Sequence, residues 1–181
     1  VAHFEDHFYI TTNDNAKNFK LVKTPVDATN RENWEEVLPH RKDVLLEDIE
    51  IFKNFLVIEE RVMGLNAIRV IEWKSNKEHY IKFHDPAYQA NTFGNPEFDT
   101  ETLRYSYSSL TTPRTVYDYD MRSQRQTLMK QQEVMDAKFD PANYVSERIY
   151  AVGRDGAKIP VSVVYHKDTK VDGSAPCLLY G

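Results

Sequence analysis

Strand-like runs recur along this chain at a nearly constant interval, and this repeat restricts the possible folds more than any other feature of the sequence. One series of runs starts at Phe8, Phe55 and Leu103, which gives separations of 47 and 48 residues. Two further series begin at Phe19, Ala67 and Thr115 and at Trp34, His79 and Gln124. A period near this length, filled with short strands bounded by Asn, Asp, Gly or Pro, is typical of the blades of a β-propeller.

The segment LLEDIEIF, residues 45–52, adds a fourth strand to the repeating unit. Each unit then forms a four-stranded sheet, and a single sheet of this kind cannot bury both of its faces. Three such units cannot close a ring, because propellers typically have about four to eight blades. We therefore expect further blades before Val1. The pattern leaves one alternative open, a β-sandwich or an irregular all-β domain.

The repeat ends before FDPANY, residues 139–144, where an Asp-Pro step and an Asn favour a linker. In YVSERIYAVGRDGAKIPVSVVYHK, Asp155-Gly156 between two alternating runs predicts a hairpin with a tight turn in which both residues adopt positive φ. The last run, PCLLYG at residues 176–181, is typical of a strand buried on both faces, and we expect it to join the sheet of the hairpin. Such a strand without a following element leaves apolar surface uncovered, so we expect this chain to be part of a longer protein.

Composition argues against several classes of function. The 181 residues are 41% hydrophobic, which is enough for a folded core, and the net charge is −5. Because the chain has no basic stripe, we expect no nucleic-acid partner. Its longest apolar runs, such as residues 55–58, are far shorter than the roughly 20 residues that cross a bilayer, so we expect no membrane association. The single cysteine, Cys177, permits no internal disulfide and favours a reducing compartment, for which the cytoplasm is our first choice.

Two pairs of side chains suggest metal binding at first sight. His3 and His7 lie four residues apart, as two zinc ligands on one helix face would, but a strand follows them and we interpret them as surface histidines. Asp118 and Asp120 share one side of a predicted strand, but the glycine and the third ligand of a calcium loop are missing. We interpret these carboxylates as solvent-facing and expect neither a metal nor a cofactor.

The candidates for catalysis are weaker still. The run EER at residues 59–61 offers acid and base groups, but charged residues at the end of a strand are typical of a solvated edge, which is our interpretation. Ser174 lies in a loop outside any G-x-S-x-G motif, and no histidine follows His166 to complete a Ser, Asp, His order. We interpret Cys177 as an apolar strand residue rather than a reactive thiol. We therefore expect no catalytic residue in this chain.

The most specific signal lies in the second half of the chain. TTPRTVYDYDM, YVSERIYAVGRDGAKIPVSVVYHK and PCLLYG together resemble the prolyl oligopeptidase family of serine peptidases, and within it most closely the oligopeptidase B group. The resemblance covers essentially the whole chain and is strongest from Tyr105 to Gly181. It implies a mainly β fold, with the last blades of a seven-bladed propeller in residues 1–138, a hinge at 139–144, and the first strands of an α/β-hydrolase catalytic domain in 145–181.

The resemblance also implies an activity for a longer parent protein. In that protein a serine activated by histidine would attack the peptide carbonyl, and the propeller would restrict access to short peptides; oligopeptidase B members cleave after Arg or Lys. The catalytic triad and the substrate pocket would follow Gly181, so this segment would be scaffold, with short peptides and the remaining parent segments as its partners. The alternative, favoured by the repeat alone, is a propeller that binds proteins without chemistry.

Overall fold

The computed structural model describes residues 1–136 and 138–180. Within these residues the chain is mainly β, with fourteen strands and two short 3-10 helices, the first of which is Arg31–Asn33. None of the helices in this part of the chain has the length and apolarity that a membrane crossing requires.

Twelve strands form three antiparallel sheets, and each sheet uses four consecutive strands. The first contains β1 (Ala2–Phe4), β2 (His7–Thr12), β3 (Lys20–Pro25) and β4 (Glu35–Leu38). The second contains β5 (Val44–Ile51), β6 (Phe55–Val62), β7 (Leu65–Glu72) and β8 (Glu78–Tyr80). The third contains β9 (Tyr88–Thr92), β10 (Thr102–Ser109), β11 (Thr115–Asp120) and β12 (Gln126–Gln131). The predicted repeat of four strands is confirmed, with β1, β5 and β9 as the additional strand of each unit.

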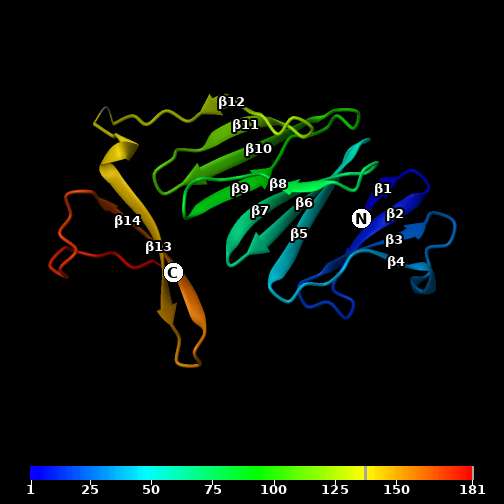
Figure 1. Cartoon of the computed structure of the whole chain (residues 1–181), viewed down its shortest axis with the longest axis horizontal. Helices are drawn as coiled ribbons and strands as arrows, with labels where there is room; N and C mark the ends of the chain where they lie inside the picture. Colours follow the sequence, from blue (N-terminus) through cyan, green and yellow to red (C-terminus); the bar gives the residue numbers. More distant parts are fainter. Residues whose placement is uncertain (137, 181) are drawn as a thin grey trace.

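The three sheets lie side by side, and the second sheet is in the middle (Figure 1). This position explains why β6 is apolar on both faces. Phe55 and Val57 belong to the core shared with the third sheet, whereas Leu56 and Ile58 belong to the core shared with the first. Alternate side chains of a strand point to opposite faces, so a sheet between two others needs a continuous apolar run.

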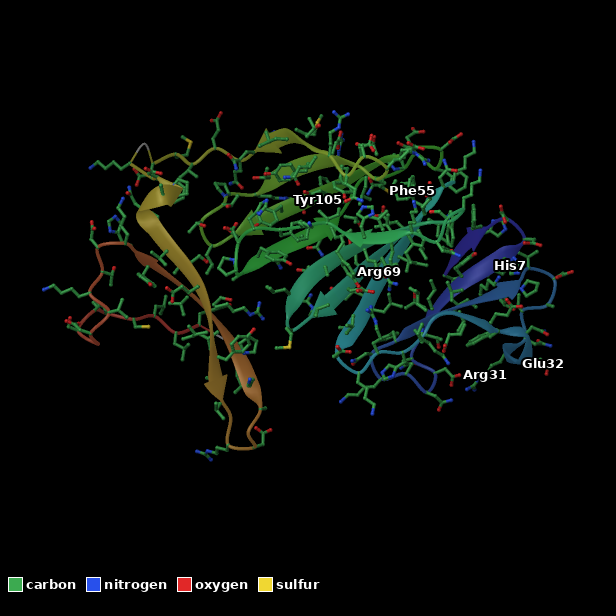
Figure 2. All side chains as sticks on the ribbon, viewed as in Figure 1. His7, Arg31, Glu32, Phe55, Arg69 and Tyr105 are labelled. Carbon is green, nitrogen blue, oxygen red and sulfur yellow. The ribbon has the colours of Figure 1, made fainter. Side chains whose placement is uncertain are left out.

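Aromatic side chains fill much of the core between the second and third sheets. Tyr105 and Phe55 are almost completely buried there (Figure 2). The Tyr105 hydroxyl donates to Gln126 Oε1 at 2.9 Å, which satisfies its polar end. Burial raises the pKa of Tyr119 to about 12, because ionisation would place a charge inside the core.

The two remaining strands, β13 (Tyr144–Val152) and β14 (Lys158–His166), form a separate antiparallel hairpin. The second 3-10 helix, Pro141–Asn143, precedes it, and Asp140 caps this helix by accepting a hydrogen bond from the Ala142 amide at 2.9 Å. The segment FDPANY between the third sheet and the hairpin therefore contains a capped turn. Figure 1 shows the hairpin beyond the third sheet, at the end of the row of sheets.

The predicted hairpin is confirmed, but its turn is wider than we expected. Gly156 has a φ of +81°, as predicted, whereas Asp155 does not adopt a positive φ. The Gly153 amide donates to the Ala157 carbonyl oxygen at 2.8 Å, and the Gly156 amide donates to the Gly153 carbonyl oxygen at 3.0 Å. The observed loop has one left-handed residue, whereas the predicted two-residue type I′ turn would need two.

The prediction of a buried strand at PCLLYG is wrong for the residues that the structure describes. Residues 176–180 have no strand geometry, and the Leu178 and Leu179 side chains are 92% and 84% exposed. Gly181 lies outside the described residues. A strand of this composition needs hydrogen-bonding neighbours and covering layers on both faces. In the described structure β14 pairs with β13, and the run does not join their sheet.

Candidate functional site

The hairpin contacts the second sheet at the turn between β6 and β7, and this contact is the candidate site. Nη2 of Arg148, on β13, donates to the main-chain carbonyl oxygen of Met63. Gly64 follows with a φ of +80°, and a Cβ atom at this position would lie 3.2 Å from Arg148 Nη2. Glycine therefore allows both the left-handed turn and the close approach of the guanidinium group.

Further polar groups surround this contact. Arg148 Nε and the Ser146 hydroxyl are buried and, among the described residues, form no hydrogen bond. Burial raises the pKa of Tyr88, at the start of β9, and the positive charge of Arg148 acts in the opposite direction. Arg148 therefore links the hairpin to the second sheet, and its charge also acts on a side chain of the third.

Our interpretation of residues 59–61 as a solvated edge is wrong, because β6 lies between β5 and β7. The Glu60 side chain is 1% exposed. Its carboxylate accepts hydrogen bonds from Arg41 and, at 2.9 Å, from the Tyr80 hydroxyl, while Arg69 Nη1 lies 3.5 Å away. Two guanidinium groups thus surround one buried carboxylate, which is how a charge is stabilised in a protein interior. These contacts assign Glu60 a structural role.

The adjacent Glu59 points to the opposite face of the second sheet, toward the third. Its Oε1 accepts a hydrogen bond from the Thr92 amide at 2.6 Å, and its Oε2 accepts one from Asn91 Nδ2 at 3.3 Å. The Thr92 hydroxyl lies 2.5 Å from Glu59 Oε1 and 2.6 Å from Glu50 Oε1. Two carboxyl groups of the second sheet therefore share one hydroxyl group of the third.

The two aspartates on β11 have different roles, and the solvent-facing interpretation is wrong for Asp118. Arg104 donates to both of its carboxylate oxygens, at 2.7 and 2.8 Å, and this pairing lowers the pKa of Asp118. Asp120 instead closes the following turn by accepting hydrogen bonds from the amides of Arg122 and Ser123, chiefly the latter, and these bonds lower its pKa. Both carboxylates are thus engaged within the third sheet and its turn.

The two histidines near the N-terminus lie on the paired strands β1 and β2, where His3 is opposite Phe8. The His3 and Phe8 rings have centroids 5.5 Å apart, and His7 Nδ1 lies 2.6 Å from the Asp6 carboxylate. The described residues contain no group of three or more His, Cys, Asp or Glu side chains that could hold a metal ion.

The structure does not assemble a nucleophile from the residues weighed in the sequence. The Ser174 hydroxyl donates to Asp172 at 2.5 Å, and His166 Nδ1 lies 3.5 Å from a different carboxylate, that of Asp168. Cys177 is exposed in the last described segment. Ser174 therefore lacks the contact with a histidine that would activate it.

Sequence reasoning did not predict which residues surround Glu59 and Glu60. These residues include Arg41, Arg69 and Thr92, and also Glu50, which shares the Thr92 hydroxyl group. Their contacts with one another and with residues 59–60 cross up to 42 positions of sequence, so no local motif connects them. The sequence did contain one indication of this burial. The apolar run before Glu59 covers both faces of the strand, so polar residues later in the same strand are expected to be buried as well.

Comparison with known proteins gives a consistent family. Residues 1–132 match the family described as prolyl oligopeptidase, N-terminal β-propeller domain. A dipeptidyl aminopeptidase BI from Pseudoxanthomonas mexicana is 43% identical over 180 residues, which cover 98% of this chain and 24% of that protein. A protease 2 from Moraxella lacunata is 29% identical over 182 residues, which cover 100% of this chain and 26% of that protein.

Solved structures agree with this result. Oligopeptidase B from Leishmania major matches with a TM-score of 0.83 and 32% sequence identity, and the match covers 94% of this chain and 25% of that one. The chain thus spans about a quarter of the length of the relatives it matches.

Proposed function

Because this chain belongs to the prolyl oligopeptidase family and carries part of its N-terminal β-propeller domain, we propose that it is a segment of a serine peptidase that hydrolyses short peptides. Three successive four-stranded sheets followed by a hairpin of different pattern carry this proposal. The peptidase names of the relatives support it.

We further propose the division of the chain that the sequence suggested. Residues 1–138 form the last blades of a seven-bladed propeller, 139–144 form the hinge, and 145–181 begin an α/β-hydrolase catalytic domain. Two observations support this division, the end of the repeat before Pro141–Asn143 and the separate sheet of β13 and β14. In this arrangement Arg148 and Met63 belong to the two domains, and their hydrogen bond crosses between them.

The chemistry would belong to the parent protein. A serine activated by a histidine attacks the peptide carbonyl, an aspartate orients the histidine, and hydrogen-bond donors stabilise the negative oxygen of the intermediate. This segment contributes support: its sheets would help enclose the substrate, and its hairpin would start the catalytic sheet. We place the parent protein in the cytoplasm, with short peptides as substrates.

Two substrate preferences are supported by different relatives. Resemblance to the oligopeptidase B group favours cleavage after Arg or Lys, and the similarity to the L. major oligopeptidase B structure agrees with it. The relative with 43% identity is a dipeptidyl aminopeptidase by name, which favours release of dipeptides from free N-termini. The two preferences differ in the need for a free α-amino group, which makes them separable.

The test uses the complete parent protein. A serine-directed fluorophosphonate should label it, and labelling should stop when the serine of its G-x-S-x-G motif is replaced by alanine. Hydrolysis of N-blocked arginyl amides would support cleavage after basic residues, whereas hydrolysis that requires an unblocked dipeptidyl amide would support dipeptide release. A folded parent protein without labelling or hydrolysis would overturn the peptidase proposal and favour a binding scaffold.

A further inference from the structure

A hydroxyl group has one hydrogen, and this limits how Thr92 can bond to its two acidic neighbours. Its Oγ1 lies 2.6 Å from Glu50 Oε1 and 2.5 Å from Glu59 Oε1. Only one of these contacts can use the Thr92 hydrogen. For the other contact to be a hydrogen bond, a carboxyl group has to carry a proton and donate it to the threonine oxygen.

The remaining contacts indicate which carboxyl group carries this proton. Both oxygens of Glu59 already accept hydrogen bonds, Oε1 from the Thr92 amide and Oε2 from Asn91. Glu50 Oε2 accepts a hydrogen bond from Asn95 Nδ2 at 2.8 Å, which leaves Glu50 Oε1 facing the Thr92 hydroxyl. Glu50 Oε1 is therefore the atom best placed to hold the proton.

The charges on the neighbouring elements favour a neutral group at this place. Asp48, also on β5, adds a second negative charge that acts on Glu50. The residues of β9 that contact Glu50 and Glu59 are uncharged, namely Asn91 and Thr92. The arginines of β6, β7 and β10 are engaged with other carboxylates, in the pairs Arg61–Glu47, Arg69–Glu78 and Arg104–Asp118. Because these arginines pair with other carboxylates, the negative charge near Glu50 is reduced by protonation instead.

The environment of Glu50 acts in the same direction. Burial raises the pKa of the Glu50 carboxyl, and the negative charges of Glu59 and Asp48 raise it further, although the hydrogen bonds from Thr92 and Asn95 oppose these effects. The neutral form is thus favoured in the folded protein relative to an exposed glutamate.

We propose that Glu50, Thr92 and Glu59 form a proton-dependent clasp between the second and third sheets. Neutral Glu50 donates to the Thr92 hydroxyl, and this hydroxyl donates to the Glu59 carboxylate. When the proton leaves, two carboxylates compete for one hydroxyl hydrogen and repel each other. The folded state binds this proton more strongly than the unfolded chain, so the clasp is complete below the ordinary pKa of glutamate and is lost as the pH rises through the raised pKa of Glu50.

Hydrogen exchange of the Thr92 amide in the complete protein tests the clasp, because this amide donates to Glu59. After correction for the intrinsic exchange rate, the wild-type protection should fall on the order of tenfold as the pH rises, because the repulsion between two carboxylates favours local opening. Glu50→Gln should retain the protection, because the neutral amide can donate to Thr92 at every pH. Glu97→Gln, at an exposed position of the β9–β10 connection, is the control and should follow the wild type.

Infrared spectroscopy supplies a second readout that does not depend on a folded variant. The wild-type protein should keep the carbonyl band of a neutral carboxylic acid at a pH above the ordinary pKa of glutamate, and this band should disappear as the pH rises through the raised pKa of Glu50. A wild-type spectrum without the band would overturn the proposal. So would equal loss of Thr92 protection in wild type and Glu50→Gln.

Discussion

Arg148 of the hairpin and Met63 of the second sheet are joined by a hydrogen bond between a side chain and the main chain across 85 positions of sequence. The bond ties the separate hairpin to the turn between β6 and β7. Because the acceptor is a main-chain carbonyl oxygen, replacing the Met63 side chain would leave the bond in place. The interaction therefore depends on Arg148 and on the shape of the turn.

Removal of this bond should free the hairpin and expose the connection before it. We expect Arg148→Ala to increase the rate of limited proteolysis at residues 139–144 in the complete protein, because cleavage needs local opening of the backbone. Arg154→Ala, in the exposed turn of the same hairpin, is the control and should cleave at the wild-type rate. First cuts within residues 55–73 in either protein would contradict the hinge, since most of those residues lie in the paired strands β6 and β7.

The hairpin turn should be sensitive at Gly156. This residue has a φ of +81°, and among the described residues no atom outside its two chain neighbours lies within 4 Å of the position that a Cβ would take, so the cost of a substitution is conformational rather than steric. We expect Gly156→Val to destabilise the hairpin by about 1 kcal/mol or more. Denaturant unfolding followed by a probe in the hairpin measures the change. Ala157→Val, at the next position, is the control; an equal midpoint for both variants would remove the turn assignment.

The buried Glu60 should contribute strongly to stability. We expect Glu60→Ala to lower the free energy of unfolding by about 3 kcal/mol. Arg41 and Arg69 both pair with this carboxylate, and its removal would leave their positive charges uncompensated. Glu36→Ala, at an exposed position on β4, should change it by less than about 0.5 kcal/mol. Equal unfolding midpoints in urea for the two variants would contradict the structural role of Glu60.

A second polar link between the second and third sheets should respond to acid. Arg122 donates to Glu72 at 2.7 Å and to Glu101 at 2.6 Å. Hydrogen bonds from Ser75 and then Arg122 lower the pKa of Glu72, and the bond from Arg122 lowers that of Glu101. A lowered pKa in the folded state gives stability that is present above the unfolded pKa and is lost as the pH falls through the folded one.

We therefore expect the difference in thermal midpoint between wild type and Arg122→Ala to be largest near neutral pH and to shrink on acidification. Lys130→Ala removes an exposed cation on β12 and is the control, with a difference that stays constant with pH. A difference for Arg122→Ala that is independent of pH between neutrality and about pH 3, below the ordinary pKa of both groups, would contradict this link.

The regular part of the fold could be predicted from the sequence because it depends on local patterns. Strand positions follow from alternation and turn residues, and the run predicted to start at Phe55 coincides with the start of β6. The role of Glu60 could not be predicted in this way. A charged residue after an apolar run gives the same sequence pattern whether its side chain is exposed to solvent or is buried and paired with a residue of another segment, as Glu60 is with Arg41.

The hairpin and the final run differ for a related reason. Tyr144–Val152 and Lys158–His166 supply each other's hydrogen bonds, so their sequence is sufficient to predict the pair. The run at residues 176–180 has the composition of a buried strand, but burial depends on layers that this composition does not specify. Its leucines are exposed in the described structure, and the prediction was wrong there.

Within each of the three sheets, every strand pairs with a strand that is adjacent to it along the chain. A sheet can therefore complete its hydrogen bonds as soon as its own four strands have left the ribosome. The two apolar faces of the second sheet are buried at different times. Leu56 and Ile58 pack against the first sheet, which is synthesised earlier, whereas Phe55 and Val57 pack against the third sheet, which is synthesised later. During synthesis each newly formed sheet therefore exposes one apolar face until the next sheet has been translated. A chaperone that binds apolar surface would prevent aggregation most effectively during this interval.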